Sequence, residues 1–480
     1  MTSSRLRRSI ARELFGAVGL GLVAASLAPA QSAARSRPAV GRLAITHPPN
    51  ALRRRLANGI DVIELPFGST PKTEIRVVVT LPDDALRSER QSMLSTIWQR
   101  GTLRVIGDAL RDSIEHMGGS LAVTSSTAGT SLSLDLLSSD IDAGIALVAA
   151  IIRKPAIDSS LVATLDRNRA RRESRGGDEG DVGSAAVALF ERDVLGIAGG
   201  RSLDADMRPR TPADIASSYA DLVTPDRVRI YLTGRFDQAR ARRALTNAFG
   251  DWTVNMRVTP TSTNARVRVE PVDSARLVLV HRQGARQSGI VVGAFVHLRS
   301  DTLFPQLRVL DALLGGSLNS RITTNIREEK GYAYSPASRL VHSAKDRAYW
   351  AEVTDVAADV TWATLREILH EIEAVSSSNP PTAAEVNGTA RFVVGSALMQ
   401  RASRGGWADE VEESEARGEA WANWDKNLSR VLEVSPSQLR SLAQRVLSPN
   451  RLTIVVVGDT TLMAAQADSI RTAFKRLRSR

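Results

Sequence analysis

Short runs rich in hydrophobic residues mark the first extended segments of the chain. Residues 59–66 (GIDVIELP) and 73–82 (TEIRVVVTLP) have the length and composition of strands, and residues 120–126 (SLAVTSS) and 130–137 (TSLSLDLL) form a second pair. The alternation in the second pair predicts antiparallel strands. Apolar residues at helical spacing then predict a helix over Ile141–Arg153.

The second half of the chain repeats this order of patterns. Two strands are predicted over residues 276–282 and 289–298, followed by a helix near 307–314. Two further strands around 333–340 and 349–353 lead to a second helix that ends near Ala374. Strands and helices grouped in this way indicate an α+β fold with mainly antiparallel sheets.

Two closing segments indicate that this repetition is a duplication. TPDRVRIYLTG ends at Gly234 and SPNRLTIVVVG ends at Gly458, and Thr211-Pro212 and Ser435-Pro436 precede them at the same distance. Upstream, RESRGG from Arg172 matches RASRGG from Arg401, with a small difference in spacing that a loop insertion explains. Self-similarity of this kind predicts two homologous lobes, each a mainly antiparallel sheet packed with helices.

The lobe boundaries follow from the repeat and from a polar stretch between the two copies. We place the first lobe at residues 45–255 and the second at residues 268–480. The stretch Met256–Val267, which carries Thr and Pro residues, is expected to join them. A chain of 480 residues also exceeds the size at which one hydrophobic core keeps growing.

Composition narrows the class of partner. Hydrophobic residues make up 43% and charged residues 24%, a profile typical of soluble globular proteins. The formal net charge of +11 is distributed in short groups such as Arg53–Arg55, which favours solvated surface over a nucleic-acid footprint. Aromatic residues, at 4%, are too few to form platforms on which single-stranded nucleic acid stacks. We therefore expect no nucleic-acid partner.

The N-terminus has the features of an export signal. Four arginines between Arg5 and Arg12 precede the apolar run Phe15–Leu27, and Ala28-Pro29-Ala30 provides small residues for cleavage. We expect residues 1–30 to be removed after Ala30 and the protein to be periplasmic, with an uncleaved anchor as the alternative. No later stretch approaches the roughly 20 apolar residues of a spanning helix, so no transmembrane segment is expected after signal removal.

The stretch LNSRITTNIREEKGYAYS, residues 318–335, closely resembles the second-lobe signature of the M16 (pitrilysin or insulinase) peptidase family. The resemblance extends from the LANG segment at Leu56 to the closing strand TIVVVGD. The resemblance implies two paired lobes that share the same fold. It also implies a zinc-bearing M16 homologue as partner, because family members of this length usually act as two-chain assemblies in which one chain carries zinc.

The resemblance further implies where a zinc site would lie. Active members carry H-x-x-E-H on a first-lobe helix, where two histidines four residues apart share one face and the glutamate accepts a proton from the metal-bound water. Gly101-Thr102 fixes the register and places Ser92, Ser95 and Thr96 at those positions. Hydroxyls are poor zinc ligands, so we expect this chain to bind no metal and no cofactor, and the zinc to be in the partner.

A third ligand, a glutamate far downstream in the family, also has no clear counterpart. Arg172 lies near its expected position, and the adjacent Glu173 is a single carboxylate without two histidines. The run Asp112–His116 (DSIEH) imitates the motif, but it follows Gly101-Thr102, and the corresponding family helix carries no metal. The remaining histidines are dispersed, there is no cysteine and no Gly-x-Ser-x-Gly elbow, and a serine triad stays open.

Arg327 and Tyr334 carry the other half of the resemblance. The family's second lobe contributes an arginine and a tyrosine seven residues apart that reach the peptide near the zinc, and both are present here as candidate substrate-binding residues. A guanidinium and a phenol can hold a peptide carbonyl and stabilise an oxyanion. The alternative makes Arg327 a helix-surface residue beside Glu328 and Glu329, and Tyr334 a strand residue half in the core.

Three hypotheses about function follow. The first is a non-catalytic subunit of a periplasmic M16-type zinc peptidase assembly, which is no enzyme on its own but binds peptide and completes the active site of its partner. Peptide capture would use an exposed strand edge, with SLAVTSS as the candidate. The second is a structural scaffold or peptide-holding protein with no role in hydrolysis. The third and weakest is an independent metallopeptidase.

Overall fold

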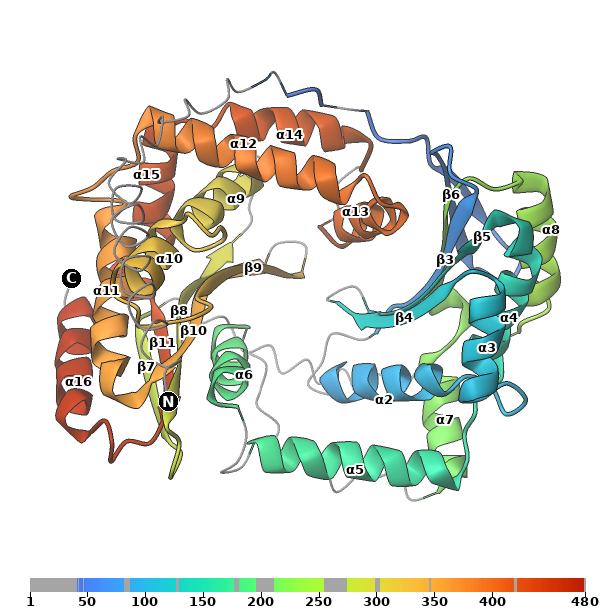
Figure 1. The fold of residues 1–480 in the computed structure, drawn as a ribbon, viewed down its shortest axis with the longest axis horizontal. Coiled ribbons are helices and arrows are strands. Elements are labelled where there is room, and N and C mark those ends of the chain that lie inside the picture. Colours follow the sequence, from blue (N-terminus) through green and yellow to red (C-terminus); the bar gives the residue numbers. More distant parts are fainter. Residues whose placement is uncertain are drawn as a thin grey trace, which may run out of the picture. The chain divides into compact units, whose positions relative to one another are not determined.

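The computed structural model describes residues 41–478 apart from 42, 46, 82–86, 127–128, 177–180, 196–210, 254–273, 298–302, 345–346 and 418–420. The chain divides into two compact units, residues 1–44 and residues 45–480. The elements below all belong to the second unit (Figure 1).

The first half of this unit alternates strands and helices in the predicted order. Its elements are β1 (Leu52–Arg55), β2 (Asp61–Pro66), β3 (Lys72–Val79), α2 (Arg87–Arg100), α3 (Asp108–His116), β4 (Ser120–Ser125), β5 (Thr130–Leu137), η1 (Ser138–Asp140), α4 (Ile141–Arg153), α5 (Ser159–Gly176), α6 (Val182–Leu195), α7 (Pro212–Leu222), η3 (Pro225–Arg227), β6 (Val228–Gly234) and α8 (Gln238–Phe249).

The second half repeats the order. Its elements are β7 (Arg276–His281), β8 (Gln287–His297), α9 (Leu303–Leu314), α10 (Arg321–Thr323), η4 (Thr324–Glu329), β9 (Ala337–Ala344), β10 (Arg347–Ala357), η5 (Ala358–Val360), α11 (Thr361–Ala374), α12 (Ala383–Gln400), α13 (Arg404–Arg417), η6 (Trp421–Asn423), α14 (Trp424–Leu432), α15 (Pro436–Val446), η7 (Pro449–Arg451), β11 (Thr453–Gly458) and α16 (Ala464–Arg478).

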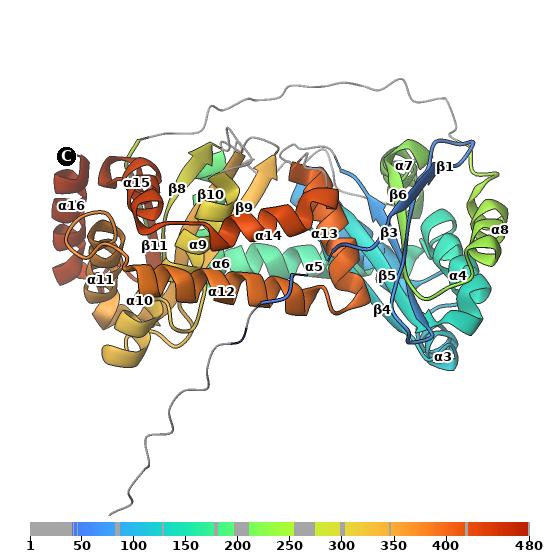
Figure 2. The same ribbon diagram turned by 90° about the horizontal axis from the view of Figure 1, so that it is seen from above.

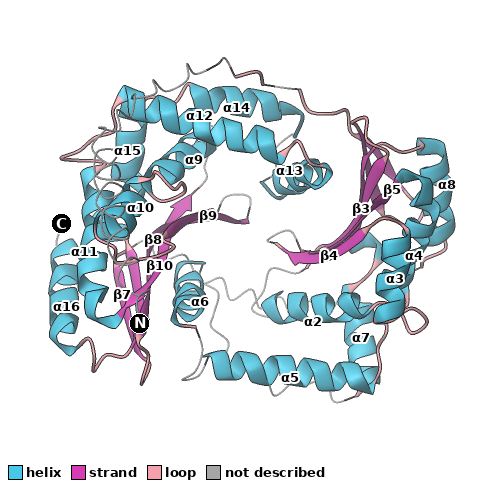
Figure 3. Cartoon of the chain, viewed as in Figure 1, coloured by secondary structure: helices cyan, strands magenta, loops and turns pink. Residues whose placement is uncertain are grey.

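The two halves build sheets of the same topology. The first sheet has the order β1-β2-β6-β3-β5-β4 and the second has the order β7-β11-β8-β10-β9. The strand of each closing repeat segment, β6 or β11, pairs in parallel with β2 or β7 and antiparallel with β3 or β8. The remaining neighbours are antiparallel. The predicted α+β fold with two similar, mainly antiparallel sheets is therefore confirmed (Figure 3).

The closing repeat segments have a common local cause. In the first, the Thr211 side chain accepts a hydrogen bond from the backbone of Asp214, with Pro212 at the first turn of α7. In the second, Ser435 and Gln438 form a reciprocal capping box at the start of α15, again with a proline in the first turn. An N-cap hydroxyl followed by proline starts a helix at a defined residue, which explains why the two copies keep the same spacing to β6 and β11.

Strand limits in the second half differ from the prediction around Tyr334. The strand expected from residue 333 begins at Ala337, because Pro336 cannot donate a ladder hydrogen bond. Ala333 contributes only an isolated bridge to Val356, and β10 is longer than predicted. Tyr334 therefore belongs to a turn and not to a strand.

Each sheet packs its own helices on one face and a helix from the other half on the opposite face. Sheet residues including Ile75, Val77 and Leu132 form the larger core with first-half helices. On the other face, Ile63, Val78 and Tyr231 pack with Ala408 and Val411 of α13. The helix α6 is the counterpart in the second sheet, where it packs on β8, β10 and β11 (Figures 1 and 2).

This exchange of helices bears on the predicted lobes. The matching segments RESRGG and RASRGG lead into or begin α6 and α13, so the exchange is reciprocal. The stretch Met256–Val267 lies outside the described residues, so the boundaries at 255 and 268 stay a prediction. A lobe defined by sequence order does not contain every helix that covers its sheet.

Candidate functional site

Helix α2 carries the positions that the family resemblance assigns to zinc, and buried polar contacts fix it in place. The Trp98 indole donates to the Tyr219 hydroxyl at 2.9 Å, which donates to the backbone oxygen of Ile152 at 2.6 Å. Both aromatic side chains are buried. At the end of α2, Arg100 pairs with Asp158 at 3.0 Å, just before α5. The helix is thus anchored to α7, α4 and the start of α5.

Ser92, Ser95 and Thr96 are half-buried on α2. Thr96 Oγ1 donates to the backbone oxygen of Ser92 at 2.8 Å. Asn168 of α5 donates weakly to Thr96 Oγ1 at 3.5 Å. The structure therefore brings together α2 and the helix on which the third ligand was expected. The side chains of Arg172 and Glu173 lie outside the described residues.

These residues do not fit a zinc ion. Zinc sites use imidazole, thiolate or carboxylate ligands, whereas α2 offers three neutral hydroxyls at the family's positions. The Thr96 hydroxyl is already used within its own helix, in the i to i−4 bond common for threonine. No base stands at Ser95 to accept a proton from water, so no hydrolytic step can be derived for this site.

The run Asp112–His116, which imitates the zinc motif, lies on α3. The His116 ring bonds through Nδ1 to the backbone oxygen of Asp112 at 2.7 Å, on an exposed surface. Within the described part of the chain, no three His, Cys, Asp or Glu side chains gather as a group able to hold a metal. His116 is thus engaged with its own helix.

Arg327 and Tyr334 lie against each other at the surface of the second half. The Arg327 guanidinium carbon is 5.7 Å from the centroid of the Tyr334 ring, within the range of a cation–π contact. Tyr334 is 85% exposed, which contradicts the alternative that it is half in the core. Arg327 also pairs with Glu328 at 3.2 Å, as the alternative for that residue anticipated.

The segment that carries this pair is folded tightly onto itself. Residues Thr324–Glu329 form a π-helix, a form that is rare and frequent at functional sites. Its Asn325 side chain donates to Glu371 of α11 at 2.8 Å. The chain then turns back through Gly331, whose φ of 65° favours glycine, and Tyr332 N donates to Ile326 O at 2.8 Å. The arginine and tyrosine are therefore presented by a held turn.

This arrangement can bind a polar, partly planar group. An exposed phenol next to a guanidinium offers a hydroxyl, several N–H donors and a ring face within one small surface. The sequence signature located the two residues, but not the π-helix or the exposure of Tyr334. Neither feature has a local sequence signal, since the apolar spacing of the stretch is compatible with an ordinary α-helix.

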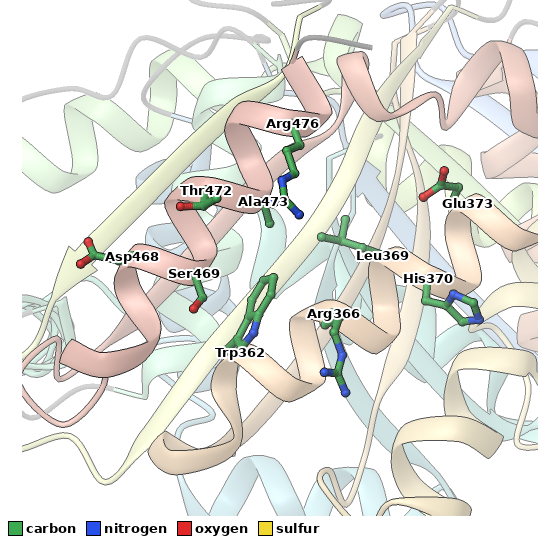
Figure 4. A pocket seen from close by; sticks show the side chains of 10 residues that line it. All are labelled: Trp362, Arg366, Leu369, His370, Glu373, Asp468, Ser469, Thr472, Ala473 and Arg476. Carbon is green, nitrogen blue, oxygen red and sulfur yellow. The ribbon is translucent and has the colours of Figure 1, made fainter.

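A separate pocket of about 630 Å³ lies between α11 and α16 (Figure 4). Its lining mixes both signs of charge, with Arg366, Glu373 and Asp468 beside Trp362. A second pocket lies between α4 and α8, the helix pair at the equivalent place of the first half. Because the two grooves share their place in the repeat but not their lining, helix packing explains them without a ligand.

The predicted signal, residues 1–30, lies outside the described residues. Among the helices that can be described, none is both long and apolar enough to cross a membrane.

Comparisons with known proteins agree with the resemblance. The model of the peptidase M16 inactive domain matches residues 210–391. An uncharacterised zinc protease of Mycobacterium leprae is 23% identical over 347 residues, which cover 71% of this chain and 76% of the relative.

Solved structures support the fold. A peptidase M16 inactive domain from Pseudomonas fluorescens aligns with a TM-score of 0.70 and 17% identity, over 86% of this chain and 98% of that one. The first half of the periplasmic protease PqqL from Escherichia coli aligns with a TM-score of 0.63 and 14% identity, over 91% and 98%. The chain thus matches the peptidase M16 inactive domain over residues 210–391, and its two-sheet fold is similar to those of M16 peptidase structures.

Proposed function

We propose that this chain is a non-catalytic subunit of an M16-type zinc peptidase assembly, in which it binds peptide and completes the active site of a zinc-bearing partner. One observation carries the proposal: Arg327 and Tyr334 are in contact and presented at the surface, whereas hydroxyls stand at the zinc positions of α2. A chain that retains a substrate-facing pair without a metal site has the parts of a helper and lacks those of a catalyst.

The chemistry assigned to the pair is the binding of a peptide carbonyl. Arg327 donates charge-assisted hydrogen bonds, and the Tyr334 hydroxyl adds a neutral donor on the same side. Contact with the tyrosine ring also restricts the arginine side chain, which reduces the entropy lost when it engages a ligand. Edge strand β4, which lies within the SLAVTSS segment, is the candidate for main-chain pairing with the peptide.

Export to the periplasm belongs to this proposal. Its support is the arginine-rich and apolar N-terminus, with a periplasmic protease among the structures of similar fold. Cell fractionation with N-terminal sequencing tests it. A mature chain that begins at Gln31 agrees with export, whereas a full-length cytoplasmic chain contradicts it.

The test of the proposed function is a peptidase assay of the assembly. The tagged chain is purified from its own cells, a co-purifying chain with H-x-x-E-H is identified, and hydrolysis of a fluorogenic peptide is measured. Arg327→Ala is expected to lower kcat/KM about 10²-fold, the loss typical of one oxyanion donor. Tyr334→Phe keeps the ring and is expected to lower it less.

Arg366→Ala is the matched control, because Arg366 is an exposed arginine of the same half that pairs with one neighbouring carboxylate, Glu367. It should leave hydrolysis unchanged. Full activity of the assembly with both Arg327→Ala and Tyr334→Phe would contradict the proposed role.

A scaffold or peptide-holding protein is the second candidate. The loss of a base at Ser95 favours it as much as it favours a helper subunit. Co-purification with an envelope assembly that contains no peptidase would support this candidate.

A further inference from the structure

Three polar side chains meet where α9 packs on the second sheet, one of them (Glu352) buried and the other two half-buried. Asp311 comes from α9, Ser338 from β9 and Glu352 from β10, and we call them the carboxyl cluster. Ser338 Oγ donates to Asp311 Oδ1 at 2.5 Å, and the Trp350 indole donates to the same oxygen at 3.0 Å. Asp311 therefore has donors for its charge.

Glu352 has none. The residue is fully buried, and neither carboxyl oxygen has a hydrogen-bond partner within the described part of the protein. One carboxyl oxygen of Glu352 lies so close to Gly315 that a Cβ atom added to this glycine would overlap it. The same added Cβ would lie 3.0 Å from Ser338 Oγ. The carboxyl of Glu352 thus lies against the end of α9, next to the Asp311–Ser338 pair.

The first half shows that the fold does not need these polar groups. Residues that pair side by side across a sheet form a row, and the rows of the two sheets can be matched. Ile230 and Ile454 occupy the same position in the two closing repeat segments, so the row through Ile230 corresponds to the row through Ile454. In the first sheet, Val77 pairs with both Ile230 and Leu132. The first row is Ile230, Val77, Leu132 and Val123, and the second is Ile454, Val292, Glu352 and Ser338.

The helix position gives the same correspondence. Ile97 lies four residues before Gly101, which follows α2. Asp311 lies four residues before Gly315, which follows α9. Ile97, Val123 and Leu132 belong to or pack on the apolar core of the first half. The carboxyl cluster therefore occupies positions that apolar side chains fill in the other copy of the fold.

An ionised Glu352 would be an unpaired charge in this core. Burial raises the pKa of Glu352 well above its usual value, and the neighbouring Asp311 raises it further. Burial also raises the pKa of Asp311, against the opposing hydrogen bonds from Ser338 and Trp350 and the charge of Arg308. Glu352 is thus the group that keeps a proton.

Among the described residues, no cation offsets the burial of the Glu352 carboxyl. On β10 it is flanked by Trp350 and Thr354, on β8 it pairs with Val292, and on β9 with Ser338. The buried side chains of α11 are threonine, leucine, isoleucine and alanine. Among these described neighbours, Arg308 of α9 is the positive group, and it acts on Asp311.

We propose that the carboxyl cluster is a proton-dependent lock that keeps the end of α9 and the Gly315–Gly316 turn seated on β9 and β10. Ser338 N also donates to Gly315 O at 3.2 Å, so the turn is tied to the same strand. Beyond this turn the chain leads to Arg327 and Tyr334. The lock is independent of the proposed function, since it concerns the seating of the turn and not the chemistry of the pair.

The direction of the pH effect follows from the raised pKa of Glu352. The folded state holds this proton more tightly than the unfolded chain, whose glutamates titrate at about 4.3. The contribution to stability is therefore complete below that pH and is lost as pH rises through the folded pKa. Over this window the equilibrium constant for opening rises about tenfold per pH unit.

Hydrogen exchange of residues 315–334 in the full-length chain, measured from pH 5 to about pH 9, tests the lock. Glu352→Gln keeps the shape of the side chain without a titrating proton, and Glu352→Leu copies Leu132. Because intrinsic exchange also depends on pH, each variant is compared with the wild type at the same pH. The ratio of wild-type to variant exchange should rise with pH, by up to about tenfold per unit.

Glu412→Gln is the matched control, because Glu412 is another buried carboxyl with a raised pKa but is paired with Arg76 on the first sheet. It should leave the pH dependence of residues 315–334 as in the wild type. If the ratio of wild-type to Glu352→Gln exchange rates stays constant with pH, the proposed lock is wrong. So does protection that depends on added sodium or calcium at fixed pH, since a cation would then neutralise Glu352.

Discussion

At the position of the family's second zinc histidine, Thr96 uses its hydroxyl within its own helix, where it donates to Ser92 O at 2.8 Å. This bond is a local packing feature of a half-buried helix and requires no ligand. Ser92 and Ser95 are neutral at the same face. By contrast, Tyr334 is 85% exposed and in contact with Arg327, whereas tyrosine side chains are typically at least partly buried.

A residue-scale prediction follows for α2. Ser92→Ala, Ser95→Ala and Thr96→Val, made singly or together, are expected to leave peptide hydrolysis by the assembly unchanged, because these hydroxyls take no part in it. Thr96→Val should change the free energy of unfolding by less than about 1 kcal/mol, since the carbonyl of Ser92 keeps its helical partner. Hydrolysis assays and urea titrations measure both effects, and a loss of hydrolysis with a folded triple variant would contradict the expectation.

Sequence reasoning at this scale found the residues but not their surroundings. The Gly101-Thr102 landmark placed Ser92, Ser95 and Thr96 on α2. The buried Glu352 was not predicted, because the largely apolar run of residues 349–353 indicates a strand but not which of its faces is core. Only the cross-strand register identifies Leu132 as its counterpart.

At the scale of elements, α13 is held on the first sheet by ion pairs as well as apolar contacts. Arg76 of β3 pairs with Glu74 at 2.9 Å and with Asp409 of α13 at 2.5 Å. Glu412 of α13 lies 3.5 Å from the same guanidinium and accepts from Ser126 at 3.0 Å. Burial raises the pKa of Glu412, and Arg76 opposes this effect.

The helix α6 is attached to the second sheet by apolar contacts, a hydrogen bond and an ion pair. Val182, Ala186, Phe190 and Val194 of α6 pack on the second sheet. Its polar contact with that sheet includes a bond from the Tyr349 hydroxyl to Glu191 at 2.5 Å. Asp193 of α6 also pairs with Arg276 of β7 at 3.2 Å. Both exchanged helices thus combine apolar contacts with ion pairs, and on the first sheet these converge on the buried Arg76.

Removal of Arg76 is therefore expected to be costly. Arg76→Leu leaves Glu74 and Glu412 buried without their cation and should lower the free energy of unfolding by about 3–5 kcal/mol at neutral pH. The loss should be smaller near pH 4, where the carboxyls accept protons in place of the guanidinium. Urea unfolding at the two pH values measures it.

Arg366→Ala, which removes an exposed ion pair with Glu367, serves as the comparison and should cost less than about 1 kcal/mol. Equal costs for the two arginine variants would contradict the role given to Arg76.

The molecule as a whole is a duplication in which each copy completes the other. The matching closing segments and the strand patterns were sufficient to predict two similar α+β halves. The exchange of α6 and α13 was not predictable, because an amphipathic pattern shows that a helix buries one face but not which sheet covers it. The pieces that sequence order separates are therefore not independent in packing.

Cutting the chain tests this dependence. Residues 31–260 and 261–480, expressed separately, should each fail to give a cooperative unfolding transition, because each lacks the helix that covers one face of its sheet. Expressed together, they should co-purify and regain the transition. Near-UV circular dichroism and thermal melts measure the outcome, and a separately expressed fragment that folds as stably as the pair would count against the exchange.

The central claim is that this chain holds no zinc of its own, so that in an M16-type assembly the metal would come from a partner. Metal analysis of the purified mature chain, after dialysis against zinc and then buffer, tests it most directly. We predict far less than one zinc per chain, with no change when Ser92, Ser95 and Thr96 are replaced. One tightly held zinc per wild-type chain would contradict the account.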